Sequence, residues 1–248
     1  MRAVILAGGT ATRMRPLTDI TNKHLLPVGR VPMIYHPIAQ FKRAGLRDIL
    51  VVTGREHMGH MVQQLGSGHQ FGVNFTFKVQ DRAGGIAEAL GLAKDFAGSE
   101  AVAVHLGDNI FGDSIAPYVK AYRDGGEQGA MIFLKAVDDP QRFGVAHIDE
   151  AGKVLSIVEK PSDPQSNLAV TGLYFYDNSV FDVVPTLQPS ARGELEITDV
   201  NNHFLNAGTL RSFTLDGFWT DAGTMESWKR ANELSWEMDF ADLIEHER

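Results

Sequence analysis

The chain has 248 residues, of which 44% are hydrophobic, 9% aromatic and 22% charged, which suits one large α/β domain or two small ones. Its formal net charge of −8 offers no basic field to nucleic acid or to an anionic membrane, and no apolar run approaches the roughly 20 residues of a membrane span. The lack of cysteine excludes disulfides and thiolate chemistry. The first strand starts at the N-terminus and leaves no room for a signal peptide, so we expect a cytoplasmic enzyme with neither nucleic acid nor membrane as partner.

Strands and helices alternate over the first half of the chain. Hydrophobic periodicity predicts strands at 3–7, 48–53, 74–80 and 101–106, separated by helices at 33–44, 57–65 and 86–97. This β-α-β rhythm is typical of a doubly wound, mostly parallel, Rossmann-like α/β sheet. Ligands of such sheets bind at the carboxyl ends of the strands.

The second half of the chain is richer in strands. These are predicted at 130–136, 145–149, 154–159, 169–176 and 212–215, and helices at 180–187, at 197–207 and from 225 onward. No Ser-, Pro- or Gly-rich linker separates the halves, so we expect one continuous domain. The acidic residues 245–248 are expected to be frayed.

The most informative segment follows the first strand, where residues 4–27 read VILAGGTATRMRPLTDITNKHLLP. Small residues let backbone N–H groups approach an anion, and Arg13 and Lys23 add positive charge for phosphate oxygens. The loop has no G-x-G-x-x-G pattern, which argues against a nicotinamide-dependent oxidoreductase, and no Gly-Lys-Ser/Thr closes it as in a Walker loop. The segment therefore predicts another kind of phosphate-binding enzyme.

Two aspartates occur in similar surroundings. Asp108 follows an apolar strand and Gly107, and Asp221 lies in the segment FWTDAGT at 218–224. Carboxylates at strand ends are suited to a divalent cation over a nucleotide phosphate, because Mg²⁺ prefers hard oxygen ligands. Each aspartate on its own is equally compatible with a turn or a helix cap.

Taken together, residues 6–13, Pro16-Leu17-Thr18 and residues 23–27 resemble the signature of the sugar nucleotidyltransferases, the nucleoside-diphosphate-sugar pyrophosphorylases. Segments 108–111, 169–178 and 190–199 are similar to the members that transfer a thymidylyl group from dTTP to glucose 1-phosphate, and the resemblance covers nearly residues 1–232. It implies a single nucleotidyltransferase domain over 1–248. The nucleotide-binding half would be about 1–112, the sugar-binding half about 113–223 and the C-terminal helix about 224–248.

The resemblance also implies roles for matching residues. Catalysis would involve Arg13, Lys23, Asp108, Lys160 and Asp221, with Mg²⁺ as cofactor held by Asp108 and Asp221. Nucleotide-binding residues would be Leu6, Gly8, Gly9, Thr10, Ala11, Thr12, Arg13, Lys23, His24, Gln80, Gly85 and Asp108. Residues binding the sugar phosphate would be Asn109, Gly144, Glu159, Lys160, Val170 and Thr171. A homo-oligomer, commonly a tetramer, is implied as well.

Some positions depart from the family pattern or leave the interpretation open. His24, Glu88 and Phe143 stand where close members tend to carry Gln, Gln and Tyr, and the charge of His24 is expected to respond to pH. Glu159 ends a predicted strand and Lys160 follows it, so the two side chains should point to opposite faces and not neutralise each other if the strand continues.

Two alternatives to a dTTP-using enzyme remain. UTP is one, because the thymine methyl is a small group, worth only about 1–3 kcal/mol. A non-catalytic, sugar-nucleotide-binding regulatory domain on the same fold is the other. The presence of Arg13, Lys23, Asp108 and Asp221 argues against such a domain.

Overall fold

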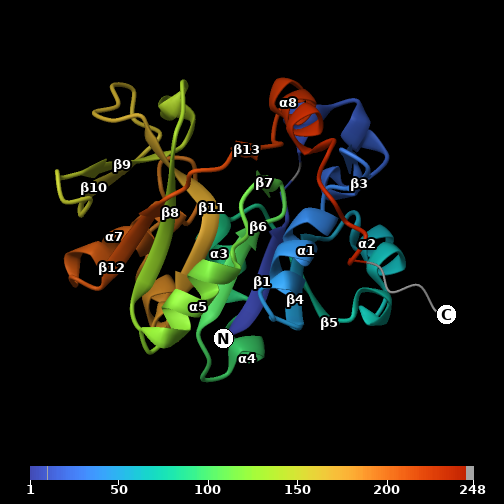
Figure 1. Ribbon diagram of the computed structural model, residues 1–248, viewed down its shortest axis with the longest axis horizontal. Coiled ribbons are helices and arrows are strands. Elements are labelled where there is room, and N and C mark those ends of the chain that lie inside the picture. Colours follow the sequence, from blue (N-terminus) through green and yellow to red (C-terminus); the bar gives the residue numbers. More distant parts are fainter. Residues whose placement is uncertain (10, 244–248) are drawn as a thin grey trace. The chain divides into compact units, whose positions relative to one another are not determined.

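The computed structural model describes residues 1–9 and 11–243 (Figure 1). The chain divides into two compact units: unit 1 comprises Met1, 84–104 and 121–216, and unit 2 comprises 2–83, 105–120 and 217–248. Thr10 and the C-terminal residues expected to be frayed lie outside the described residues. Over the described ranges, we find no helix with the length and apolarity needed to cross a membrane.

Unit 2 is built on parallel strands. β1 (Arg2–Ala7) pairs with β4 (Asp48–Gly54), and β4 pairs with β5 (Asn74–Gln80), all in parallel. β1 and β4 are buried along almost their whole length, as expected of strands covered on both faces. The chain passes between these strands through α1 (Tyr35–Arg43) and α2 (Met58–Leu65). The carboxyl ends of β1, β4 and β5 therefore lie at one edge of this sheet.

Two short strands in unit 2 bring distant segments together. β6 (Val102–Leu106) leads into β7 (Asn109–Phe111), which pairs antiparallel with β13 (Trp219–Asp221). In this ladder Asp221 lies opposite Asn109. β2 (Pro27–Val28) and β3 (Val31–Pro32) form a second small ladder.

The last helix of unit 2 is α8 (Met225–Ser235), which starts at a capping box made by Thr224 and Ser227. Its Ala231 belongs to a buried cluster with Val28, Met33, Ile110 and Ala222. Because Ala222 directly follows β13, this cluster fixes the end of that strand.

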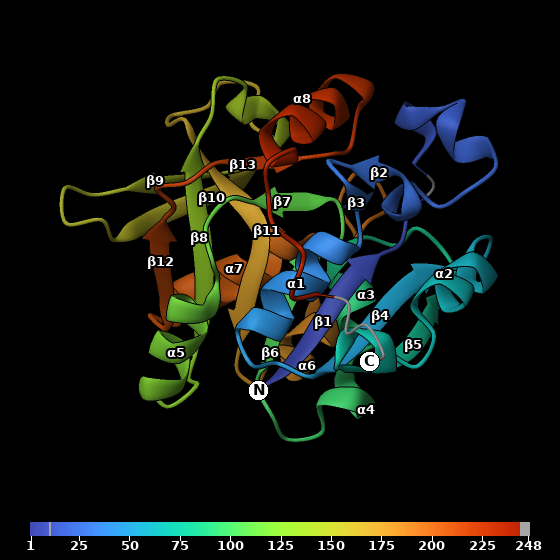
Figure 2. The ribbon, with the colours of Figure 1, turned by 45° about the vertical axis from the view of Figure 1, so that its right-hand side comes forward.

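Unit 1 contains a mixed sheet. β9 (Gly144–Ile148) and β10 (Val154–Glu159) form a hairpin, and β11 (Leu168–Tyr176) pairs antiparallel with both β9 and β8 (Ala130–Ala136). β12 (Leu210–Thr214) runs parallel beside β8 (Figure 2). The register of β11 against β8 shifts between Val170 and Tyr174, which marks a bulge. α7 (Ile197–Asn206) contacts β10 through Asn202, whose Nδ2 donates to Ile157 O at 3.1 Å.

The predicted α/β fold class is confirmed, and the strands expected at 74–80, 130–136 and 154–159 have the predicted bounds. The helix expected at 86–97 is wrong as one element. It consists of α3 (Ile86–Gly91) and α4 (Lys94–Ala97), since glycine, a poor helix former, ends α3 at position 91. The helix expected at 180–187 also divides, into α6 (Val180–Val183) and a 3₁₀ turn at Val184–Thr186. Pro185 in that turn has no N–H with which to continue an α-helix.

Several elements were not predicted from the sequence. They are α5 (Ala116–Asp124) and the short strands β2, β3, β7 and β13. The two-residue and three-residue strands carry too little periodicity to be recognised locally. β7 and β13 form because each is the other's distant partner, whereas β2 and β3 pair with each other across a short turn.

Candidate active site

The loop after β1 has the backbone of a ligand-binding turn. Gly9 has a φ of +93°, and Ala11 has a φ of +47°, in the left-handed region that residues with a Cβ seldom adopt. Thr18 stabilises this conformation, because its Oγ1 donates to Ala11 O at 2.9 Å. A 3₁₀ turn, Thr12–Met14, follows and carries Arg13. Loops with left-handed residues form the backbone concavities in which anions bind.

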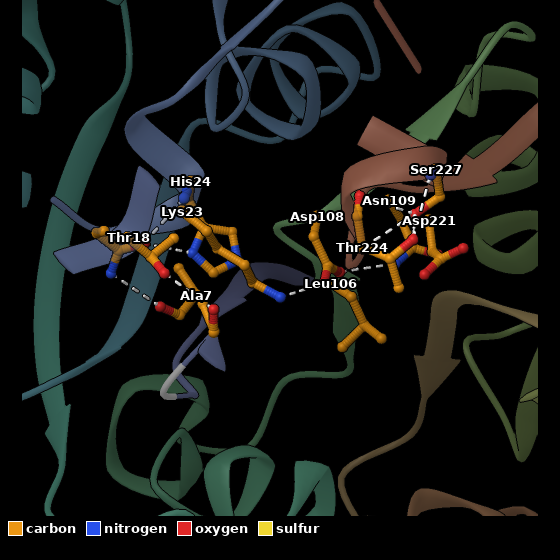
Figure 3. A network of polar contacts seen from close by, with 12 residues as sticks. Ala7, Thr18, Lys23, His24, Leu106, Asp108, Asn109, Asp221, Thr224 and Ser227 are labelled. Carbon is orange, nitrogen blue, oxygen red and sulfur yellow. Dashed lines mark hydrogen bonds and ion pairs between the residues drawn. The ribbon is translucent and has the colours of Figure 1, made fainter. Parts of the chain in front are cut away.

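Three of the predicted charged side chains of unit 2 converge on Gly223. A Cβ added to this glycine would lie 3.0 Å from Asp221 Oδ2, 3.4 Å from Arg13 Nη2 and 3.8 Å from Asp108 Oδ2. The N–H of Ala222 donates to Asp108 O at 2.7 Å, which extends the β7–β13 ladder up to the two carboxylates. Figure 3 shows Asp108, Asn109 and Asp221 on these neighbouring segments. A residue with a side chain at 223 would fill the space between the carboxylates and the guanidinium.

Lys23 completes this group, because its Nζ forms an ion pair with Asp108 Oδ2 (Figure 3). The pair is largely withdrawn from solvent, with side-chain exposures of 13% for Lys23 and 18% for Asp108. Burial raises the pKa of Asp108, whereas the charge of Lys23 and the hydrogen bonds from Lys23 and Asn109 lower it. The lowering effects are larger together, so the pKa of Asp108 lies below its usual value. Asp108 is therefore a carboxylate at neutral pH and available to a cation.

Asn109, which was predicted to bind the sugar phosphate, lies in this same group in unit 2. Its Nδ2 donates to Asp108 Oδ1 at 2.9 Å, and its Oδ1 accepts from Trp219 Nε1 at 2.7 Å. The amide thus links the carboxylate of Asp108 to the ring of Trp219 on the partner strand.

His24 differs from its expected behaviour. It is 1% exposed, and its Nδ1 and backbone N–H lie 2.6 and 2.9 Å from Asn22 Oδ1. Burial, and then the charge of Lys23, lower its pKa from 6.5 to about 3, so the expectation that its charge responds to pH near neutrality is wrong. A Cβ on Gly107 would lie 2.7 Å from His24 Cδ2, so the neutral ring packs directly against the residue before Asp108.

A cavity of about 480 Å³ opens in unit 2 between the loop and the carboxyl ends of β4 and β5. Its lining includes the predicted residues Gly9, Ala11 and Lys23, and also Gln80 at the end of β5. A Cβ on Gly8 would lie 2.8 Å from Gln80 Oε1, so the loop and this amide are in close contact. The volume is within the range typical of small-molecule sites.

Sequence reasoning missed part of the cavity wall. The lining residues that were not predicted are Thr18, Thr21, Asn22, Gly54, Arg55, Glu56, His57 and Asp81, and the wall also contains Arg82 and Ala83. Most of them follow β4 or β5 directly, and Gly54 lies opposite Gln80 in that pair of strands. The rule that ligands bind at strand carboxyl ends would have found them.

A second predicted group gathers around Glu159 at the end of β10 in unit 1. Its Oε1 lies 3.2 Å from Lys160 Nζ and 3.3 Å from Arg192 Nη2, and its Oε2 accepts from Thr198 Oγ1 at 2.6 Å. Gly144 lies opposite Glu159 in the hairpin, and a Cβ on it would come within 3.4 Å of Glu159 Oε2. The carboxylate is therefore held from three sides while it stays 26% exposed.

The ion pair between Glu159 and Lys160 corrects the expectation that these neighbours would face apart. The strand ends at Glu159, and Lys160 has a φ of +44°. This left-handed turn brings both side chains to one side, and Lys160 N donates to Phe143 O at 2.9 Å. Strained backbone of this kind in a residue with a side chain is concentrated at functional sites.

The remaining predicted residues of unit 1 lie in β11 and in the segment before α3. Val170 and Thr171 are buried at the start of the β11 bulge, and Thr171 Oγ1 has no hydrogen-bond partner among the described residues. Gly85 has a φ of +101° and packs against the backbone of Leu195. Arg192 and Glu196 were not predicted, although both lie in a segment that carried the family resemblance.

Comparison with known proteins gives the family. A family model described as nucleotidyl transferase matches residues 2–237. The chain belongs to the nucleotidyl transferase family. This confirms the sequence-based assignment to the nucleotidyltransferases, and with it the expectation of an enzyme.

Individual members of the nucleotidyl transferase family are similar over most of the chain. A glucose-1-phosphate thymidylyltransferase of Xanthomonas campestris pv. campestris is 45% identical over 229 residues, which are 91% of this chain and 77% of that protein. A crystal structure from Bacillus anthracis, assigned as a glucose-1-phosphate thymidylyltransferase in complex with sucrose, has 54% identity and a TM-score of 0.93 over 97% of each chain. A UDP-glucose pyrophosphorylase shares the fold, with a TM-score of 0.82 at 21% identity over 96% of this chain and 99% of that one.

Members of this family are generally metal-dependent, and the residues around Gly223 fit Mg²⁺. The described residues contain no group of three or more His, Asp or Glu that could hold a metal. Mg²⁺ is usually bound by one or two carboxylates together with substrate phosphates. Asp108 and Asp221, whose carboxylates both lie close to Gly223, would supply these two carboxylates.

Proposed function

We propose that this nucleotidyl transferase transfers the thymidylyl group of dTTP to glucose 1-phosphate, giving dTDP-glucose and pyrophosphate. The observation that carries the proposal is the convergence of Arg13, Asp108 and Asp221 on Gly223, with Lys23 paired to Asp108. The names of the similar proteins support the choice of substrates. An oxygen of the sugar phosphate attacks the α-phosphorus in line, the bond to the bridging oxygen breaks, and pyrophosphate leaves without a covalent enzyme intermediate.

In unit 2, the cationic groups of Arg13 and Lys23 bind the phosphate oxygens. Arg13 stabilises the charge that accumulates on the leaving pyrophosphate, as a guanidinium presents fixed donors to phosphate. Gln80 offers one donor and one acceptor to the base edge, and the cavity beside it holds the nucleoside.

In unit 1, Glu159 accepts hydrogen bonds from sugar hydroxyls, and Lys160 neutralises the attacking phosphate. The support for these roles is that Arg192 and Thr198 hold the carboxylate while part of it faces solvent. Gly144 and the bulge at Val170 and Thr171 offer backbone groups to the same ligand.

Asp108 and Asp221 would hold Mg²⁺, which supplies neutralising charge to the phosphate oxygens when bound. Asp108 stays ionised because Lys23 lies beside it, and binding of a metal would compete with that ion pair. We further propose that the enzyme works in the cytoplasm, and that it forms a homo-oligomer, as the family resemblance implies.

The proposal is tested by measuring pyrophosphate release over a small matrix of nucleotides and sugar phosphates. The nucleotides are dTTP and UTP, and the sugar phosphates include glucose 1-phosphate, each with and without Mg²⁺. We expect the highest kcat/KM for dTTP with glucose 1-phosphate and no turnover in EDTA. A higher kcat/KM with UTP than with dTTP would show that UTP is the preferred nucleotide. If no pair released pyrophosphate, the protein would be a non-catalytic binding domain.

A further inference from the structure

Glu196 is a buried carboxylate whose side-chain hydrogen bonds come from Ser190 and Arg192, neither of which was predicted to bind substrate. It is 8% exposed and is the N-cap residue of α7, directly before Ile197. Its two oxygens lie 2.9 and 2.8 Å from Arg192 Nη2, and Oε1 also accepts from Ser190 Oγ at 2.6 Å. A buried carboxylate with this many donors holds its charged partner in one place.

The guanidinium that Glu196 holds is the one that reaches the sugar-phosphate group. The same Nη2 of Arg192 lies 3.3 Å from Glu159 Oε1. Arg192 is 42% exposed and also lies 3.6 Å from the more exposed Glu194. Without Glu196, the long arginine side chain would be divided between Glu159, Glu194 and water, since exposed ion pairs hold side chains only weakly.

The backbone around Glu196 is itself fixed. Leu195 N donates to Gly84 O at 2.8 Å, and Ala87 N donates to Leu195 O at 3.1 Å. Gly85 lies between these bonds, and a Cβ there would be 2.7 Å from Leu195 N, so no side chain fits. Glu196 therefore projects from a segment that the chain ties down immediately before the helix.

We propose that Glu196 is a positioning residue of the sugar-phosphate site, which acts through Arg192 to hold Glu159 in the orientation that binds the sugar. The inference rests on the proposed function, because it takes Glu159 as the sugar-binding carboxylate. Its effect falls on one substrate only. Loss of the Glu196 carboxylate weakens the binding of glucose 1-phosphate and leaves the nucleotide site of unit 2 unchanged.

The test is Glu196→Gln in the full chain, with Glu194→Gln as the matched control, since Glu194 contacts the same guanidinium from its exposed side. For Glu196→Gln we expect the KM for glucose 1-phosphate to rise about tenfold, as for the loss of one charge-assisted hydrogen bond, with kcat and the KM for dTTP within twofold. Glu194→Gln should stay within twofold throughout. Glu196→Asp keeps the charge, so its KM for glucose 1-phosphate should lie close to that of wild type. A low KM for the Asp variant would show that a charge at this position, and not a folding defect of the Gln variant, explains the increase.

A double-mutant cycle shows whether Glu196 acts through Arg192. In an Arg192→Ala background, Glu196→Gln should raise the KM no further. A KM within twofold of wild type for Glu196→Gln alone, or a full tenfold increase in the Arg192→Ala background, would overturn the inference.

Thermal stabilisation by glucose 1-phosphate alone separates this inference from the proposed function, because it needs no turnover. Wild type should be stabilised, and Glu196→Gln should need about ten times more ligand for the same shift in Tm. Equal stabilisation of both proteins would overturn the role of Glu196. A wild type that is stabilised but does not use dTTP would overturn the proposed function only.

Discussion

The two units organise charge in opposite ways. In unit 2 the central residue is a glycine, Gly223, and two carboxylates and a guanidinium lie around it. In unit 1 the centre is a carboxylate, Glu159, surrounded by an ammonium, a guanidinium and a hydroxyl. The first arrangement leaves space for a cation and phosphate oxygens, and the second presents an acceptor to hydroxyl groups. If the two substrates bind as proposed, separate sets of residues recognise them, and mutations in the two units should have separable effects.

The largest expected effect tests the charge of unit 2. Arg13→Ala should lower kcat by about a hundredfold, because a missing transition-state donor costs roughly 3 kcal/mol. Arg15→Ala is the control, since Arg15 lies in the same loop, is 65% exposed and pairs with Asp19. Steady-state kinetics and thermal melts of both variants check the result. Near-normal turnover of Arg13→Ala would remove Arg13 from the mechanism.

Acid should destabilise unit 2 selectively. Burial is the main cause that lowers the pKa of His24 to about 3 and of His36 and His105 to about 4, and all three lie in unit 2. Below the ordinary pKa of 6.5 the unfolded chain binds protons that the folded chain does not, so stability falls as the pH is lowered toward 4.

From pH 6.5 to 5.5 the loss should be about 3 kcal/mol, or about 1 kcal/mol for each histidine. Urea unfolding at the two pH values measures it. His105→Phe, which keeps an aromatic ring between Phe41 and Phe111, should reduce the loss by about a third. A variant with the full pH dependence would show that His105 is protonated in the folded state.

The smallest of these effects should fall on unit 1 alone. Glu159→Gln should raise the KM for glucose 1-phosphate about thirtyfold and leave the KM for dTTP unchanged, since a hydrogen bond to a charged group is worth about 1.5–3 kcal/mol. Glu150→Gln, at an exposed turn of the same hairpin, is the control. Equal increases in both KM values would mean that the two groups of residues are not separable.

The sequence predicted the regular strands of both units because their periodicity is local. β5, β8 and β10 show this, with bounds that match the prediction. The approach of Asp108 and Asp221 to Gly223 has no such local signal, and only the resemblance to a family indicated that the two aspartates belong together. In the structure it depends on β7 and β13, which are three residues each and are far apart in the chain.

Side-chain directions at the site were harder to predict. The positive φ of Lys160 turns its side chain to the same side as that of Glu159. This was not predicted, because a lysine with a positive φ has no sequence signature. Burial lowers the pKa of His24, and the packing that buries it, including its approach to Gly107, forms only in the folded chain. Arg192 and Glu196 could have been predicted as site residues, because they are charged and lie in a segment that carries the family resemblance. The contacts that they make could not be predicted from the sequence.

The β7–β13 ladder has a consequence for how the protein is made. Asp108 emerges from the ribosome long before Asp221, and the strand that carries Asp221 is fixed by Ala222 and Ala231 in the buried cluster with Val28. A nascent chain that ends just before β13 therefore contains the loop after β1 and Asp108 but lacks Asp221. A chain terminated anywhere between β7 and β13 contains β7 as well as the loop after β1 but lacks β13, so β7 has no partner strand and only one of the two aspartates is present.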